Sequence, residues 1–145
     1  MNSIRRALVA AFVFTLVRPL SALAAWNKEA FSAKSAGDAL KNLGIASATP
    51  SNELSVEVPQ IAENGAVVPI EISSAIPGTT ALIVVIDKNP IPLISRFDFK
   101  EGALPFVKVN VKMGETSDVR VLAEAAGKYY VTTREVKVTI GGCGG

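Results

Sequence analysis

The 145-residue sequence predicts an all-β fold, an antiparallel β-sandwich preceded by short helices. From residue 55 onward, apolar and polar residues alternate with period two, which is the pattern of half-buried strands. Turn-forming residues separate these segments, and the helical crossovers that a parallel sheet needs are missing from the pattern. For one domain of this length, we expect an immunoglobulin-like sandwich of about seven strands.

Two short helical segments are expected first. Asn27 and Ser35 are favourable N-cap residues, and the residues that follow each of them favour helix. Ser35 and Asp38 have the spacing of a capping box, and Gly44 ends the second segment. Three apolar residues of these segments are expected to pack against the body as a stripe: Phe31, Leu40 and Leu43.

The strands are expected in short segments that turn residues separate. The segments are Ser55–Val58, Ala66–Ile72, Thr80–Ile86, Ile94–Phe99, Phe106–Met113, Asp118–Ala125, Lys128–Thr133 and Lys137–Ile140. The turns between them are Asn64-Gly65, Pro77-Gly78, Asn89-Pro90, Glu101-Gly102, Gly114 and Gly127. In the fifth segment, the valines at 107, 109 and 111 should face one side, and Lys108, Asn110 and Lys112 the other.

The segment Leu82–Ile86 is apolar at every position. A strand of this composition is buried on both of its faces. The sequence leaves its second cover open between the sandwich core with its loops and another subunit.

The composition excludes several kinds of active site. The chain has no histidine, so it has no Ser-His-Asp or Cys-His catalytic arrangement and no histidine ligand for zinc, copper or haem. Cys143 is the single cysteine, which excludes an internal disulfide and a metal site built from several thiolates. We therefore expect no metal site of these kinds.

Residues 1–24 are predicted to be a signal peptide. Paired arginines at 5 and 6 precede the apolar run Ala7–Val17, and small residues lead to a cleavage site after Ala24. The alternative is a membrane anchor, but eleven helical residues rise only about 17 Å against a hydrocarbon core of about 30 Å. The arginine pair leaves open whether export is twin-arginine or ordinary secretion. We expect a periplasmic protein without a membrane span after cleavage.

Nucleic acid is not an expected partner. The basic excess of the whole chain lies in the signal segment, at Arg5, Arg6 and Arg18. Without these three, 12 basic residues remain against 13 acidic residues. A near-neutral chain lacks the clustered Lys and Arg that displace counterions from nucleic acid.

The mature chain divides into the body, residues 25–140, and a terminal pentapeptide, residues 141–145. In the pentapeptide, Cys143 is surrounded by glycine: Gly141, Gly142, Gly144 and Gly145. Glycine weakens regular structure, so we expect this segment to be mobile and to project from the body. The alternative, a cysteine buried as a small apolar side chain, does not fit these neighbours or the chain end. A lone thiol in an exported protein is a reactive group or a coupling point between chains.

Catalysis by Cys143 alone is not expected. An unperturbed thiol has a pKa of about 8.5, and its activation requires a base, a cation, a metal or a helix N-terminus. The terminal carboxylate at Gly145 opposes thiolate formation, and a loose tail cannot hold Lys137 in a fixed pair with the thiol. We therefore expect a swinging arm whose thiol carries a covalent cargo and is acted on by other proteins.

The sequence resembles the SoxY family, the sulfur carriers of the periplasmic sulfur-oxidising (Sox) system. The residues that carry the resemblance are the terminal pentapeptide with Glu135–Ile140 before it, and three internal blocks at 63–69, 88–93 and 113–120. The pentapeptide at the chain end, together with these blocks and an export signal, is specific to the family. Gly114 departs from the pattern, because a bulkier residue is more usual there.

The resemblance implies a carrier without enzymatic activity that holds no metal or other cofactor. It implies that the carrier forms a heterodimer with SoxZ and carries sulfur on Cys143. It implies that the SoxAX cytochrome couples thiosulfate to this thiol as an S-thiosulfonate. It further implies that the SoxB hydrolase releases sulfate and that the SoxCD sulfane dehydrogenase oxidises the remaining sulfur. The 88–93 and 113–120 blocks are candidates for docking or subunit contact, although turn and strand formation would explain them equally well.

Two other functions remain open from the residues. The protein could be an exported adhesion or attachment module whose cysteine forms an interchain disulfide. It could also be a thiol peroxidase or reductase, which predicts turnover by the isolated chain.

Overall fold

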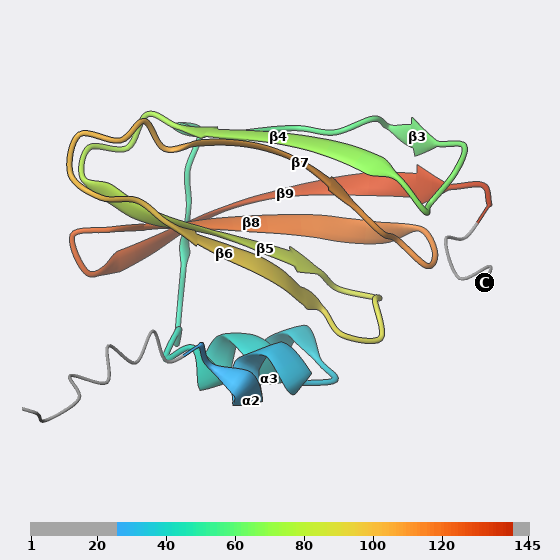
Figure 1. Cartoon of the computed structure of the whole chain (residues 1–145), viewed down its shortest axis with the longest axis horizontal. Helices are drawn as coiled ribbons and strands as arrows, with labels where there is room; N and C mark the ends of the chain where they lie inside the picture. Colours follow the sequence, from blue (N-terminus) through green and yellow to red (C-terminus); the bar gives the residue numbers. More distant parts are fainter. Residues whose placement is uncertain (1–25, 141–145) are drawn as a thin grey trace, which may run out of the picture.

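The computed structural model describes residues 26–140, so the expected signal segment and the terminal pentapeptide lie outside the described residues. The helices and strands in chain order are α2 (Lys28–Ser32), α3 (Ala36–Asn42), β1 (Thr49–Pro50), β2 (Leu54–Glu57), β3 (Ile61–Ala62), β4 (Val68–Ser74), β5 (Thr79–Ile86), β6 (Leu93–Asp98), β7 (Phe106–Val111), β8 (Ser117–Ala125) and β9 (Lys128–Val138). Two sheets lie face to face, and the helices lie against the outside of one of them (Figure 1). The predicted all-β sandwich is confirmed.

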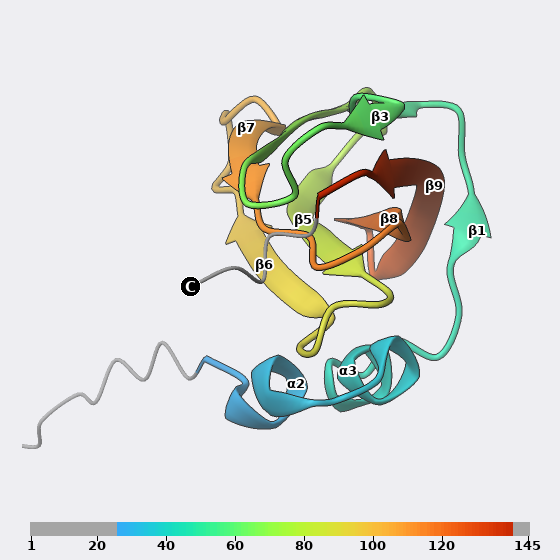
Figure 2. The same cartoon turned by 90° about the vertical axis from the view of Figure 1, so that its right-hand side faces the viewer.

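The larger sheet has the strand order β1-β9-β8-β5-β6, and β3 joins it by pairing with β9. The smaller sheet has the order β2-β4-β7. The pairings are antiparallel except at β1 and β3, which each run parallel to β9. Figure 2 shows that β1, β3 and β9 lie on one side of the sandwich and that β6 and β7 lie on the other.

Strand β9 replaces two strands that the sequence predicts separately, at 128–133 and 137–140. Its register with β8 is continuous from Lys128 opposite Ala125 to Val136 opposite Ser117. Between the two predicted segments, Arg134 and Glu135 are both exposed, which interrupts the alternation of a half-buried strand, although Val136 is buried. The backbones of these residues still pair with β8. Strands β1 and β3 were not predicted, because two residues are too short to carry a periodic pattern.

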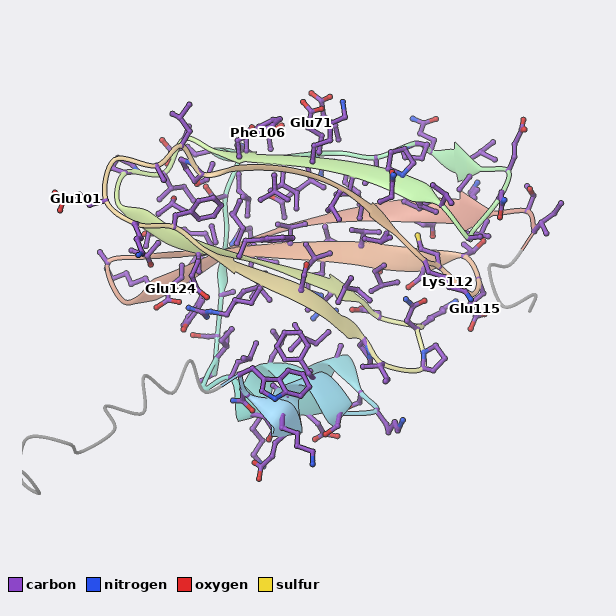
Figure 3. The ribbon with its side chains drawn as sticks, in the orientation of Figure 1. Glu71, Glu101, Phe106, Lys112, Glu115 and Glu124 are labelled. Carbon is purple, nitrogen blue, oxygen red and sulfur yellow. The ribbon has the colours of Figure 1, made fainter. Side chains whose placement is uncertain are left out.

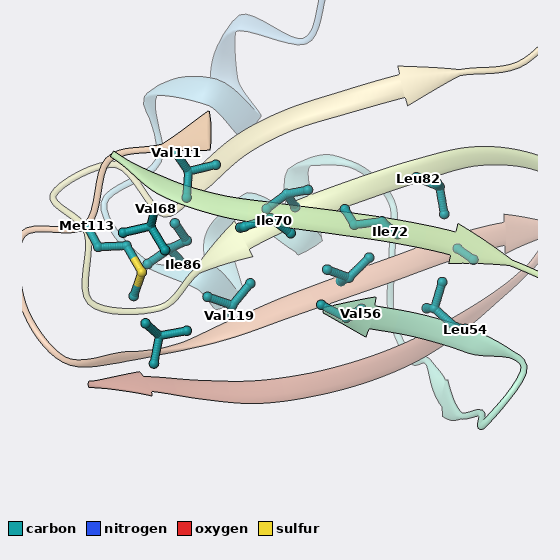
Figure 4. Packing of buried hydrophobic residues seen from close by; sticks show 14 of the residues in the cluster. Leu54, Val56, Val68, Ile70, Ile72, Leu82, Ile86, Val111, Met113 and Val119 are labelled. Atoms are coloured by element: carbon teal, nitrogen blue, oxygen red, sulfur yellow. The ribbon is translucent and has the colours of Figure 1, made fainter. Parts of the chain in front are cut away.

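The main core fills the space between the two sheets. Ile70 and Ile72 of β4 and Leu82 of β5 are completely buried there, as Figure 4 shows. On β7, Val107 and Val109 pack against this core, whereas the lysine and asparagine between and after them are exposed. The alternation predicted for this strand is confirmed.

A second apolar cluster lies between the larger sheet and the helices. Ile83 and Val85 of β5 are completely buried in it, together with Ala30 of α2 and Ala39 of α3. The predicted stripe packs here as well: Phe31, Leu40 and Leu43. The second cover of β5 is therefore the helical pair of the same chain, which is neither of the two covers left open by the sequence.

Side-chain caps fix where the helices begin, as predicted. Asn27 Oδ1 accepts a hydrogen bond from the Ala30 amide at 2.9 Å. Ser35 Oγ accepts from the Asp38 amide at 3.0 Å and donates to the Asp38 carboxylate at 2.7 Å. Gly44 follows α3 with a φ of 77°, a conformation that glycine adopts without strain. Neither of these helices, nor any other within residues 26–140, has the length and apolarity needed to cross a membrane.

The packing of the helices on β5 predicts that the side chains beneath them contribute to the stability of the fold. Ile83→Ala should lower the free energy of unfolding by about 2–5 kcal/mol, because it leaves a cavity beneath the helices. Urea denaturation followed by circular dichroism measures this change. Ser55→Ala, at an exposed position of β2, is the control and should have little effect. A near-neutral Ile83→Ala would mean that the helices do not pack on β5.

Candidate functional site

The predicted sulfur-attachment residue and its glycine neighbours lie outside the described residues: Gly141, Gly142, Cys143, Gly144 and Gly145. The structure does describe the point at which the chain reaches them. Ile140 follows the end of β9, and its side chain is 68% exposed. We call the end of the sandwich at which β9 finishes the exit end; it lies on the right in Figure 1 and faces the viewer in Figure 2.

The last residues of β9 are held by the segment that contains β3. The Lys137 amide donates to the carbonyl of Gln60 at 3.0 Å, and the Thr139 amide donates to the carbonyl of Ala62 at 3.1 Å. The Thr139 hydroxyl adds a hydrogen bond to the carbonyl of Glu63 at 3.1 Å. The path of the chain is therefore fixed beyond the end of the strand itself.

Gly65 connects Ile140 to the β7–β8 loop. Its amide donates to the carbonyl of Ile140 at 2.8 Å, and its carbonyl accepts from the amide of Met113 at 2.7 Å. The turn that places Gly65 is closed by Asn64 Oδ1, which accepts from the Ala66 amide at 2.8 Å. The sequence predicts a turn at Asn64-Gly65, but it gives no sign that this turn contacts the chain end.

Asn89 joins the β5–β6 loop to the β7–β8 loop. Its side-chain amide donates to the carbonyl of Lys112 at 2.7 Å, and its Oδ1 accepts from the Gly114 amide at 3.2 Å. The Lys88 amide donates to the buried hydroxyl of Ser117 at 3.0 Å. The three internal blocks at 63–69, 88–93 and 113–120 are thus linked to one another or to the end of β9 at the exit end.

Large apolar side chains remain exposed at the exit end. They belong to β3, to the loops after β3 and β5, and to the end of the described chain: Ile61 (58%), Val67 (58%), Ile91 (42%) and Ile140 (68%). We call these four residues the exit patch. Figure 3 shows the charged residues Lys112 and Glu115 at the same end of the molecule. Exposed apolar side chains with charged neighbours are typical of protein interaction sites.

Arg96 is the described group with a clear pKa shift, and it does not belong to the exit end. Burial acts to lower its pKa, but hydrogen bonds to Asp98 and Glu124 outweigh the burial and raise the pKa above the ordinary value. The guanidinium thus keeps its charge and ties β6 to β8. Among residues 26–140, no group of three or more Asp, Glu, His or Cys side chains is placed to hold a metal ion.

Comparison with known proteins identifies the family. The family model described as sulfur oxidation protein SoxY matches residues 41–143, a range that ends at Cys143. The solved structure of the sulfur carrier protein SoxY from Chlorobium limicola f thiosulfatophilum is 34% identical. The match covers 71% of this chain and 96% of that chain, with a TM-score of 0.63.

Other structures share the fold at low sequence identity. Superoxide reductase (neelaredoxin) from Ignicoccus hospitalis is 14% identical, with a TM-score of 0.54 over 60% of this chain and 80% of that chain. A variant of the same reductase gives a TM-score of 0.53 at the same identity, over 68% of this chain and 86% of that chain. These likenesses concern the fold alone, and none of the curated proteins compared matches the chain. The family match and the Chlorobium structure confirm the resemblance seen in the sequence: this chain belongs to the SoxY family of sulfur oxidation proteins.

Proposed function

We propose that this protein is a periplasmic sulfur carrier and that Cys143 holds sulfur intermediates covalently during thiosulfate oxidation. The observation that carries the proposal is the SoxY family match, which extends through the body to Cys143 itself. The Chlorobium relative, similar over 96% of its length, is a sulfur carrier protein. A signal peptide at residues 1–24, with cleavage after Ala24, would bring the chain to the periplasm.

The proposed carrier residue is a short distance along the chain from a fixed point. Ile140 is held through Gly65, and Cys143 follows it by three residues. At about 3.3–3.6 Å per extended residue, the thiol reaches up to about 10 Å beyond Ile140. The glycines around the thiol add no side chains, so one arm can enter several differently shaped active sites. Tethering keeps the cargo at a high effective concentration near a docked enzyme.

The first chemical step that we propose is oxidative. A bond forms between the Cys143 sulfur and the outer sulfur of thiosulfate, the thiol proton is released, and two electrons pass to a cytochrome partner of the SoxAX type. Hydrolysis by a SoxB-type enzyme then releases sulfate and leaves a persulfide on the carrier. A SoxCD-type sulfane dehydrogenase then oxidises the outer sulfur of the persulfide to a sulfonate, with water supplying the three oxygens and six electrons passing to a cytochrome acceptor. A further hydrolysis releases this sulfonate as a second sulfate and regenerates the thiol.

In this proposal the body is a docking partner and not an enzyme. It pairs with a SoxZ subunit, and it offers the exit patch to each visiting enzyme. Two observations support this use of the patch: its four side chains are exposed, and they belong to strand ends and loops at the end of the sandwich where the chain continues toward Cys143. Hydrogen bonds among the exit-end loops hold the patch in a fixed arrangement, which lowers the entropy cost of docking.

Cys143→Ser should fold with unchanged stability and carry no sulfur. Intact-mass spectrometry of protein from thiosulfate-grown cells should show added sulfur, thiosulfonate or sulfonate groups on the wild type and none on the variant. An unmodified wild-type thiol, or a fixed interchain disulfide, would contradict the carrier and favour an attachment module.

A double variant with Gly142→Val and Gly144→Val should slow sulfur transfer more than it lowers stability, because the two side chains add bulk beside the thiol. Thermal unfolding and reconstituted thiosulfate oxidation give the two measurements. Replacing the same glycines with Ala is the milder control. Equal turnover of all three proteins with every enzyme would remove the steric part of the proposal.

Ile91→Asp should weaken docking of the Sox enzymes by about tenfold, since a charge replaces an apolar contact within the exit patch. The matched control is Leu104→Asp, which changes a more exposed apolar side chain on the β6–β7 loop at the opposite end. Steady-state kinetics with each purified enzyme measure the effect on the Michaelis constant. Equal effects of the two variants would show that the exit patch has no special role.

A further inference from the structure

Strand β7 forms an open edge of the smaller sheet. It pairs with β4 on one side, and no strand within the described part of the chain pairs with its other side. Figure 2 shows β7 on the same side of the sandwich as β6, which is the last strand of the larger sheet. Two sheet edges therefore lie on the same side of the sandwich.

The backbone groups of Lys108 and Asn110 point toward this open edge. In an antiparallel pair, every second residue hydrogen-bonds to the partner strand and the residues between them point away. The Ser74 amide donates to the carbonyl of Pro105 at 3.1 Å, which assigns the odd-numbered residues of this register to the β4 side. Pro69, which has no amide hydrogen, lies opposite Asn110 and agrees with this assignment.

The other sheet edges carry features that block strand pairing. Strand β6 has an extra residue, Ile94, which the register with β5 skips, and such a bulge disrupts an edge. Strand β1 is only two residues long and ends in Pro50. At the edge of β2, the carbonyl of Leu54 accepts a hydrogen bond from the hydroxyl of Thr132 at 3.0 Å. Strand β7 has neither a bulge nor a proline.

Core residues are incompletely covered between β6 and β7. Five apolar side chains from or next to these two strands pack against the main core yet stay partly exposed: Ile94, Phe97, Phe99, Val107 and Val109. We call this set the seam. A strand added to β7 would bring alternate side chains over the seam, so backbone pairing and apolar burial would favour the same partner.

The charge of β7 discriminates between possible partners. On its outward face, Lys108 is 71% exposed and contacts Glu71 of β4 at 3.0 Å, and the exposed Asn110 and Lys112 follow. This face of β7 has no acidic residue. A second copy of the chain, paired antiparallel through β7, would place lysines near lysines, which is unfavourable. An added strand with carboxylates opposite Lys108 and Lys112 would instead place acidic side chains beside these lysines. It would continue the pairing of opposite charges across the sheet that Glu71 and Lys108 begin.

We propose that β7 binds an extended strand of a different protein, with apolar side chains over the seam and acidic side chains beside Lys108 and Lys112. This inference rests on the proposed function for the identity of that protein, which is the stable companion subunit of the carrier. The added strand pairs with the backbone of Lys108 and Asn110. It therefore runs beside the exit end, because β7 leads into the loop that contacts Gly65.

Asn110→Pro tests the inference in the full-length mature protein, with the purified SoxZ subunit of the same organism as the probe. Proline removes an outward amide and keeps every β4–β7 hydrogen bond, so the fold should survive. We expect titration calorimetry to show binding weakened by about tenfold or more. The control variant Asn110→Ala keeps the backbone amide and should bind like the wild type. Lys108→Glu, like Asn110→Pro, should bind more weakly than the wild type.

Amide hydrogen exchange of the wild type gives a second measurement that does not depend on the variant folding. We expect Lys108 and Asn110 to become protected when SoxZ binds. Binding without this protection, or equal affinity of Asn110→Pro, would overturn the β7 inference and leave the carrier function intact. If the wild type does not bind SoxZ, the companion-subunit part of the proposed function falls together with this inference. Protection of β7 by self-association of the chain alone would identify a second copy as the occupant and overturn the proposed chemistry.

Discussion

The hydrogen bonds that hold the last residues of β9 are the constraint on which the exit end depends. Strand β3 and Gly65 form hydrogen bonds with backbone groups at the end of β9, which would otherwise bond to water as the chain leaves the sheet. Because Gly65 also accepts from Met113, the direction in which the chain leaves is coupled to the position of the β7–β8 loop. Asn89 extends this coupling to the β5–β6 loop. The loops at the exit end thus form one hydrogen-bonded unit.

The helices affect function through the surface that they occupy. They cover the outer face of β5 and leave the exit end and the outer face of the smaller sheet uncovered within residues 26–140. A central strand that is buried on both faces gives the sandwich a rigid middle, so its ends can carry loops chosen for contact with other proteins. In this chain, stability comes from the two apolar clusters, and the proposed contacts lie at the end and at one edge.

The sequence predicted the fold class, the helix caps, the stripe on the helices and the alternation of β7. These features are local, since they depend on residue type and on spacing within one segment. The continuous β9 and the short parallel strands were missed, because strand pairing can cross exposed residues and can join segments far apart in the chain. The helical cover of β5 was missed because an apolar strand does not specify what packs on it.

The candidate site divides in the same way. Cys143 and its glycines were identified from composition and from their position in the chain. Their role in sulfur attachment stays a prediction, because they lie outside the described residues. The three internal blocks were recognised as a family pattern, but their meeting at the exit end depends on long-range hydrogen bonds such as the one from Gly65 to Ile140, which no periodic pattern encodes.

The length of β9 also has a mechanical consequence. It pairs with β8 along its register from Lys128 to Val136 and runs toward the chain end. The hydrogen bonds between β8 and β9 lie perpendicular to the strands. A force that pulls the carboxyl terminus outward along β9 would therefore load these bonds in shear, all at the same time, and would not break them one after another. A partner that binds the terminus and pulls on it would have to break several hydrogen bonds at once to separate β9 from the sheet.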